Sequence, residues 1–133
     1  MQTVHKDQLQ HRQLKSHQTG ELYSFSDVVS DLFKSKQVFL THDRIAPHQR
    51  SSSAHRHSTI EEIVYVVKGE LTLQFGESNQ TISEGTFIFF DPHDQEFHCL
   101  VNQTQQEVEA ITFSIKRERD VVIYDSQQPS DEG

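Results

Sequence analysis

The chain has 133 residues, of which 12 are basic and 20 acidic, giving a formal net charge of −8 at pH 7. This length fits one domain with its own core and is too short for two ordinary domains. The acidic balance argues against nucleic acid as a partner, because binding a phosphate backbone requires a basic patch and none is present.

Cysteine content and hydropathy bear on where the protein acts. Cys99 is the only cysteine, so a disulfide within the chain is impossible, which fits a reducing compartment. No apolar run approaches the roughly 20 residues of a membrane span. The segment Met1 to Lys6 lacks the apolar stretch of a secretory signal. We therefore expect a cytoplasmic protein with no membrane partner.

The first part of the chain is polar. Residues 1–20 are rich in Gln, His and Lys and cannot bury enough apolar surface to fold unaided, so we predict a polar N-terminal arm. Residues 26–33 have the pattern of a short helix. Ser26 can cap its first turn, Asp27 suits its N-terminus, and four apolar residues share one face.

From residue 37 the pattern becomes that of strands. β-Branched and aromatic residues alternate with polar ones, and Gly, Asn, Asp and Pro mark the turns. The predicted strands are 38–42, 63–67, 71–75, 80–82, 86–90, 97–101 and 107–115. Short strands at this spacing favour an all-β sandwich or barrel. We expect a single domain over residues 21–124, followed by a polar tail at 125–133.

Two histidines and a glutamate lie close together before the strand 63–67. His55 and His57 are two residues apart, so both imidazoles project from one face of an extended segment. Glu62 follows His57 by five residues, and an uninterrupted strand would place it on the opposite face. The three side chains can meet only if the chain bends at the polar residues Ser58 and Thr59.

A third histidine, His98, lies in a later strand on the same face as Leu100 and Asn102. Three imidazole nitrogens and one carboxylate oxygen suit Zn, Fe, Mn, Ni, Co or Cu, whereas Ca and Mg prefer oxygen ligands. Taken singly, such a histidine is more often a surface residue or a hydrogen-bonded core residue. Spacing alone therefore leaves the metal site and the structural interpretation open.

The order of these residues resembles the first motif of the cupin superfamily, Gly-x5-His-x-His-x3,4-Glu-x6-Gly. His55, His57, Glu62 and Gly69 match it in type and spacing, and Gln49 stands in place of the leading glycine.

Later residues resemble the second cupin motif, Gly-x5-Pro-x-Gly-x2-His-x3-Asn. Gly85, Pro92, His98 and Asn102 match it, with the His-x3-Asn spacing intact. Asp94 replaces the internal glycine, and the intervals on both sides of Pro92 are one residue longer than in the motif. The resemblance covers about residues 38–115.

This resemblance to small single-domain cupins implies a double-stranded β-helix, or jelly-roll barrel, with the short helix near the N-terminus. By position it implies that His55, His57, Glu62 and His98 bind one divalent transition metal inside the barrel. It also implies a site for a small polar or aromatic molecule, in a dioxygenase or an isomerase. Residues 50–52 and 119–125 resemble the small cupins grouped with sugar-phosphate isomerase-like proteins.

Two alternatives to an enzyme remain open. One is a cupin that binds or stores a small molecule without turnover, and the other is a purely structural barrel. In all of these cases, the edge strands of the sheets expose unpaired backbone groups that another segment must cover. The arm at 1–20 and the strand near 38–41 could pair across a two-fold axis, so we expect a homodimer.

Overall fold

The structure, a computed structural model, describes residues 1–125. Two helical turns lie near the N-terminus, η1 (Lys6–Gln8) and α1 (Val29–Leu32). The strands within the described residues are β1 (Arg12–Lys15), β2 (Leu22–Val28), β3 (Val38–Ile45), β4 (His55–His57), β5 (Glu62–Lys68), β6 (Leu71–Phe75), β7 (Ser78–Ile82), β8 (Phe87–Phe90), β9 (His98–Val101), β10 (Val108–Ile115) and β11 (Val122–Tyr124). Of the predicted tail at 125–133, residues 126–133 lie outside the described range.

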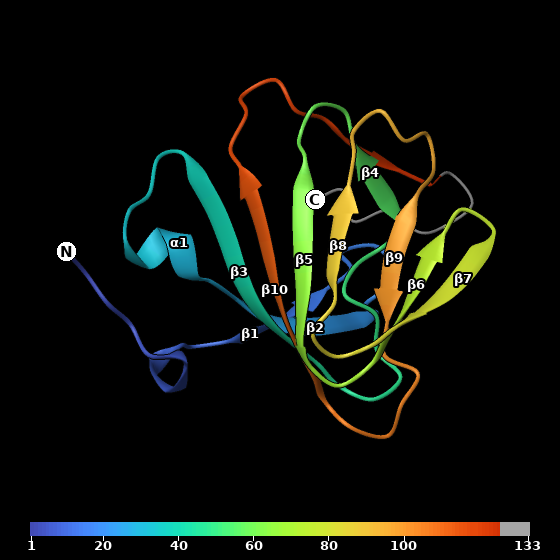
Figure 1. The fold of residues 1–133 in the computed structure, drawn as a ribbon, viewed down its shortest axis with the longest axis horizontal. Coiled ribbons are helices and arrows are strands. Elements are labelled where there is room, and N and C mark those ends of the chain that lie inside the picture. The colour runs from blue at the N-terminus through green and yellow to red at the C-terminus, as the bar shows by residue number, and fades with distance from the viewer. Residues whose placement is uncertain (126–133) are drawn as a thin grey trace.

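These strands form two antiparallel sheets (Figure 1). One sheet has the strand order β1-β2-β3-β10-β5-β8, and the other has the order β11-β4-β9-β6-β7. The all-β prediction is confirmed, with α1 as a single short α-helix in the described part of the chain. Among residues 1–125, no helix has the length and apolar character needed to cross a lipid bilayer.

One core fills the space between the sheets. Alternate residues of β5 and β10 are buried, including Val64 and Val66 on the first and Val108 and Ala110 on the second. Leu71, from the other sheet, is also fully buried in this cluster. The alternation arises because successive strand residues point to opposite faces, and only one face of each sheet meets the core.

The predicted helix at 26–33 is wrong in its first half. Ser26, Asp27 and Val28 belong to β2 and pair with Asp43, His42 and Thr41 of β3. The helix begins only at Val29, and no side chain caps it. Backbone pairing with a long neighbouring strand therefore overrides the local capping preference.

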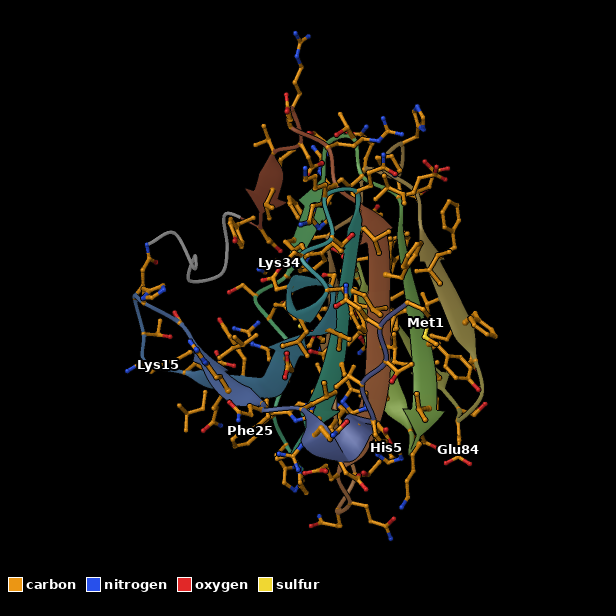
Figure 2. All side chains as sticks on the ribbon, turned by 90° about the vertical axis from the view of Figure 1, so that its left-hand side faces the viewer. Met1, His5, Lys15, Phe25, Lys34 and Glu84 are labelled. Atoms are coloured by element: carbon orange, nitrogen blue, oxygen red, sulfur yellow. The ribbon has the colours of Figure 1, made fainter. Side chains whose placement is uncertain are left out.

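The N-terminal segment extends the larger sheet at its edge. β1 pairs antiparallel with β2, and the hairpin they form projects to one side with Lys15 near its tip (Figure 2). Because the seven predicted strands correspond to β3 and β5 to β10, the strands β1, β2, β4 and β11 are additions that the sequence pattern did not predict.

Candidate metal centre

Three of the four proposed ligands converge in the structure. β4 pairs with β9, and the register places His55 directly opposite His98, with their ring centroids 4.7 Å apart. Glu62 begins β5 in the other sheet. One ligand atom from each of these residues lies within 4.8 Å of the other two. The cluster therefore joins the two sheets, and it is the one group of this kind within residues 1–125.

His57 lies beside this cluster. Its Nε2 atom is 3.6 Å from Oε2 of Glu62, while Nε2 of His98 is 3.6 Å from Oε1 of the same carboxylate. The chain bends at Ser58 and Thr59, as strand parity required. Each carboxylate oxygen of Glu62 therefore faces one histidine: Oε2 faces His57 and Oε1 faces His98.

Hydrogen bonds fix two of the imidazole rings. Nδ1 of His55 donates to the carbonyl oxygen of Ser53 at 2.8 Å, and Nδ1 of His57 donates to Oδ2 of Asp120 at 2.8 Å. A neutral imidazole that donates through Nδ1 has an unprotonated Nε2. Such partners commonly orient metal-binding histidines. In their neutral forms, both residues thus present Nε2 as an electron-pair donor.

His98 provides the test of whether a metal fits. Its Nε2 atom is buried and has no hydrogen-bond partner among the described residues. The distance of 3.6 Å from this atom to Oε1 of Glu62 is too long for a hydrogen bond. Phe90 stacks on the imidazole at a centroid distance of 3.7 Å and holds the ring in place. An unpaired buried polar atom costs about 1–3 kcal/mol, and a metal ion at this point would remove that cost.

The electrostatics of the cluster favour the metal-binding forms of His55 and Glu62. Burial, followed by the nearby His98, lowers the pKa of the His55 imidazole. Burial raises the pKa of the Glu62 carboxyl, but its interactions with His98 and His55 outweigh this effect and leave the pKa below its ordinary value. Metal binding requires a neutral imidazole and an ionised carboxylate. These are the forms that the surroundings stabilise.

Asp120 is a site residue that the sequence did not reveal. Besides the bond from His57, its Oδ1 accepts the backbone N–H groups of Thr59 and Ile60 at 2.9 and 3.1 Å. Burial raises the pKa of its carboxyl, yet these hydrogen bonds outweigh burial and hold the pKa low. Asp120 therefore anchors both the bend and the His57 ring. It is 63 positions from His57, so no local spacing could indicate the contact.

The cluster borders two sizeable cavities and a much smaller one. A cavity of about 200 Å³ inside the barrel is lined by His55, Glu62 and His98. A second, of about 250 Å³, lies toward the barrel mouth, where His57 and Glu62 are joined by Lys116 and Arg117. Because Glu62 lines both, the candidate metal centre stands between the interior and the mouth.

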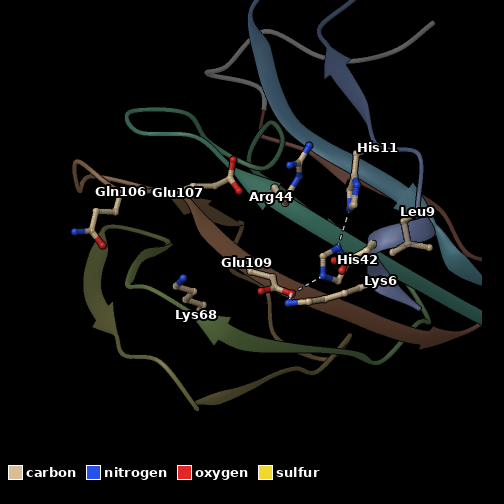
Figure 3. A pocket seen from close by; sticks show the side chains of 10 residues that line it. Lys6, Leu9, His11, His42, Arg44, Lys68, Gln106, Glu107 and Glu109 are labelled. Carbon is tan, nitrogen blue, oxygen red and sulfur yellow. Dashed lines mark hydrogen bonds and ion pairs between the residues drawn. The ribbon is translucent and has the colours of Figure 1, made fainter. Parts of the chain in front are cut away.

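A separate pocket of about 570 Å³ lies on the outer face of the larger sheet (Figure 3). His42 connects two partners in it, since its Nε2 lies 2.7 Å from Oε1 of Glu109 and its Nδ1 lies 2.8 Å from Nε2 of His11. Lys6 also reaches Glu109, at 3.4 Å. These contacts fasten the N-terminal segment to the sheet and involve none of the candidate metal ligands.

Solved structures with the same fold belong to several kinds of protein. A sugar phosphate isomerase of the cupin superfamily from Silicibacter pomeroyi is 22% identical, with a TM-score of 0.83, over 94% of this chain and 82% of that one. The polyketide cyclase RemF from Streptomyces resistomycificus is 18% identical, with a TM-score of 0.76, over 97% and 89%. A predicted oxalate decarboxylase from Thermotoga maritima is 16% identical, with a TM-score of 0.71, over 87% and 100%. At these identities the likeness shows the fold alone.

A match to a family model identifies the family, whereas the structural matches show only the fold. No curated protein matches the chain. The family model described as "Cupin domain" matches residues 41–114, which is more than half of the sequence and includes all four proposed ligands. The chain belongs to the cupin domain family.

Proposed function

We propose that this cupin holds one divalent transition-metal ion through His55, His57, Glu62 and His98 and acts on a small polar molecule bound beside it. The observation that carries the proposal is the buried, unpaired Nε2 of His98, which faces the Glu62 carboxylate within a cluster of potential ligands. Three nitrogens and one oxygen suit Zn, Fe, Mn, Ni, Co or Cu.

The protein residues would hold the ion and position the bound molecule. A metal of this kind supplies Lewis-acid polarisation of a substrate oxygen. Ser53 and Asp120 keep Nε2 of His55 and His57 available, and Phe90 fixes the His98 ring. The two cavities that Glu62 lines would give a substrate access to the cluster and room inside the barrel.

Of the two reaction classes considered, we propose an isomerase, with a dioxygenase as the second candidate. The surface of the interior cavity is mainly apolar, but Phe39 is the one Phe, Tyr or Trp among its described lining residues. Six of those residues carry hydroxyl groups, which supports a polar substrate over an aromatic one. Lys116 and Arg117 at the mouth suit an anionic group. The printed name of the Silicibacter structure, a sugar phosphate isomerase, is consistent with this choice.

Metal analysis tests the first half of the proposal. The purified protein would be loaded with each candidate ion, desalted, and its metal content measured by mass spectrometry. We expect one equivalent in the wild type and much less in His98→Ala. His93→Ala, which changes an exposed histidine paired with Asp91, is the matched control and should bind normally. A wild type that retains no ion would refute the metal site.

Turnover tests the second half. The metal-loaded protein would be incubated in D2O with an aldose phosphate, and NMR would follow both isomerisation and deuterium incorporation next to the carbonyl. Product formation that depends on the metal supports an isomerase. Full metal loading with neither isomerisation nor dioxygen uptake across a substrate panel would favour the non-enzymatic alternative.

We also propose that the chain forms a homodimer through the outer face of its larger sheet. The register places Phe113, Ile63 and Phe89 side by side on β10, β5 and β8, and all three are exposed. Phe87 adds to this apolar patch. Patches of this kind mark interaction surfaces. Light scattering should give twice the chain mass for the wild type and a monomer for Phe89→Glu; a monomeric wild type would refute the dimer.

A further inference from the structure

The inward face of β3 carries a carboxyl group where a barrel core normally has apolar residues. Phe39, Thr41, Asp43 and Ile45 all line the interior cavity. Asp43 lies opposite Ala110, which is buried. Placing a carboxyl group in such surroundings is costly unless it is compensated, so its presence calls for a physical reason.

Hydroxyl groups surround Asp43 inside the cavity. Thr41 donates from Oγ1 to Oδ2 of Asp43 at 2.9 Å, and Thr112 donates to the same oxygen at 3.4 Å. Ser26 hydrogen-bonds the carboxyl as well. These residues come from the neighbouring strands β2, β3 and β10. We name Ser26, Thr41, Asp43 and Thr112 the hydroxyl wall.

The wall remains open to a ligand. Asp43 is half-buried and borders the cavity instead of being sealed by its neighbours. Burial raises the pKa of its carboxyl, and the hydrogen bonds from Ser26 and Thr41, which lower it, do not offset that effect. The acid form, which this shift favours, can both donate and accept a hydrogen bond. A hydroxyl group of a ligand has the same dual capacity.

The wall and the candidate metal centre line a single cavity. Its volume of about 200 Å³ would hold about seven water molecules at ~30 Å³ each. A molecule that fills this space would therefore touch both the wall and the cluster of His55, Glu62 and His98. None of the described residues that line the cavity is Lys or Arg, so an anionic group has no counter-charge there.

We propose that the hydroxyl wall binds the uncharged, hydroxyl-bearing part of a polyhydroxylated substrate, with Asp43 as its central hydrogen-bonding residue. This rests on the proposed function, since it describes the substrate of the same site. The hydroxyl groups of Thr41 and Thr112 already donate to Asp43, so a ligand would use the acceptor capacity that remains on these oxygens and on the carboxyl. An aliphatic or aromatic ligand would forgo those hydrogen bonds, at about 0.5–1.5 kcal/mol each. The wall thus selects for hydroxyl groups and against apolar ligands of similar size.

Binding of defined probes to the metal-loaded protein tests the proposal. D-Ribose serves as the uncharged polyhydroxylated probe and toluene as the uncharged aromatic one, and NMR shifts of the Thr41 and Thr112 methyl groups report occupancy of the wall. We expect ribose to bind and Asp43→Ala to weaken it about tenfold, the loss of one or two uncharged hydrogen bonds. Asp43→Asn keeps a donor and an acceptor and should stay within about threefold.

The matched control is Asp27→Asn, the same change on β2, where Asp27 accepts from the backbone N–H of Gln10 and lines a different pocket. It should leave ribose binding unchanged. Thermal melts of all variants establish folding, and if Asp43→Ala does not fold, Thr112→Val replaces it with an expected loss of about threefold.

Two results would overturn the proposal: equal ribose binding by the wild type and Asp43→Ala, or toluene binding more tightly than ribose. An Asp43→Ala protein that only loses stability would show that the wall is structural, which also overturns it. Metal content is measured on the same samples, so the two proposals fail separately. A protein that retains metal but binds no ribose refutes the hydroxyl wall alone, whereas ribose binding that depends on Asp43 in a protein that retains no metal refutes the metal site alone.

Discussion

Replacing Asp120 by Asn should disable His57 as a ligand while leaving the fold in place. The Asp120 carboxylate accepts the Nδ1 proton of His57 with one oxygen and the N–H groups of Thr59 and Ile60 with the other. An asparagine that keeps its oxygen toward the two backbone groups must turn its NH2 toward Nδ1. Nδ1 then accepts, and the imidazole proton moves to Nε2, the atom that faces Glu62.

The expected loss follows from that change of tautomer. Residues that orient a metal ligand typically contribute 10–100-fold to metal affinity, or about 1.4–2.7 kcal/mol. Stability without metal should change by less than about 1 kcal/mol, because the turn keeps its uncharged hydrogen bonds. The affinity would be measured by competition with a chelator, and 15N NMR would identify the His57 tautomer.

Asp91→Asn is the matched control for this prediction. It makes the same change at an aspartate whose carboxylate accepts from Nδ1 of the exposed His93 at 2.9 Å, a histidine that is not a candidate ligand. We expect no change in metal affinity for this variant. Equal metal affinity in Asp120→Asn and the wild type would contradict the role assigned to Asp120, as would a His57 ring that keeps its proton on Nδ1.

Three further changes probe the site, a turn and the outer pocket. Glu62→Gln removes the anionic ligand and should lower metal affinity at least a hundredfold in the same chelator competition. Gly69→Ala should destabilise by about 2–4 kcal/mol in urea, since φ is +92° and the new Cβ would lie 2.9 Å from a valine methyl of β10; Gly85→Ala, at φ +85° with open space around it, should cost only about 1–2 kcal/mol. Burial raises the pKa of the Glu109 carboxyl, but the hydrogen bond from His42 outweighs it and the net pKa is lowered. That carboxylate stabilises the fold above its unfolded pKa near 4.3 and loses the effect as pH falls through the lower folded value. The stability deficit of Glu109→Gln should therefore be present at neutral pH and shrink as the pH falls from the unfolded pKa through the lower folded pKa, and a deficit independent of pH would contradict this.

Local patterns predicted most of the strands for a physical reason. Each half-buried strand requires its own alternation of apolar and polar residues, and this alternation can be recognised within about five to eight residues. The strands predicted at 63–67 and 71–75 correspond to β5 and β6 for this reason. By contrast, β4 and β11 have three residues each, too few for an alternating pattern to be recognised, and they exist because Val122 to Tyr124 pair with the histidine segment.

The helix prediction failed because two local tendencies competed. Ser26 and Asp27 suit a helix N-terminus, but they also fit a strand edge beside β3, and the hydrogen bonds of the sheet decided between them. The same pairing turned Ser26 toward the barrel interior, where it joined Asp43. A residue that looked like a cap thus became part of the cavity wall.

The sequence by itself determined the all-β class, the family and the condition under which Glu62 could join the histidines, because residue order and strand parity are local properties. Only the tertiary structure decided that His55 lies opposite His98, that Asp120 orients His57, and that Asp43 borders the same cavity. Those contacts join residues up to 63 positions apart. They depend on how the two sheets pair and close around one core, which no single segment of the chain specifies.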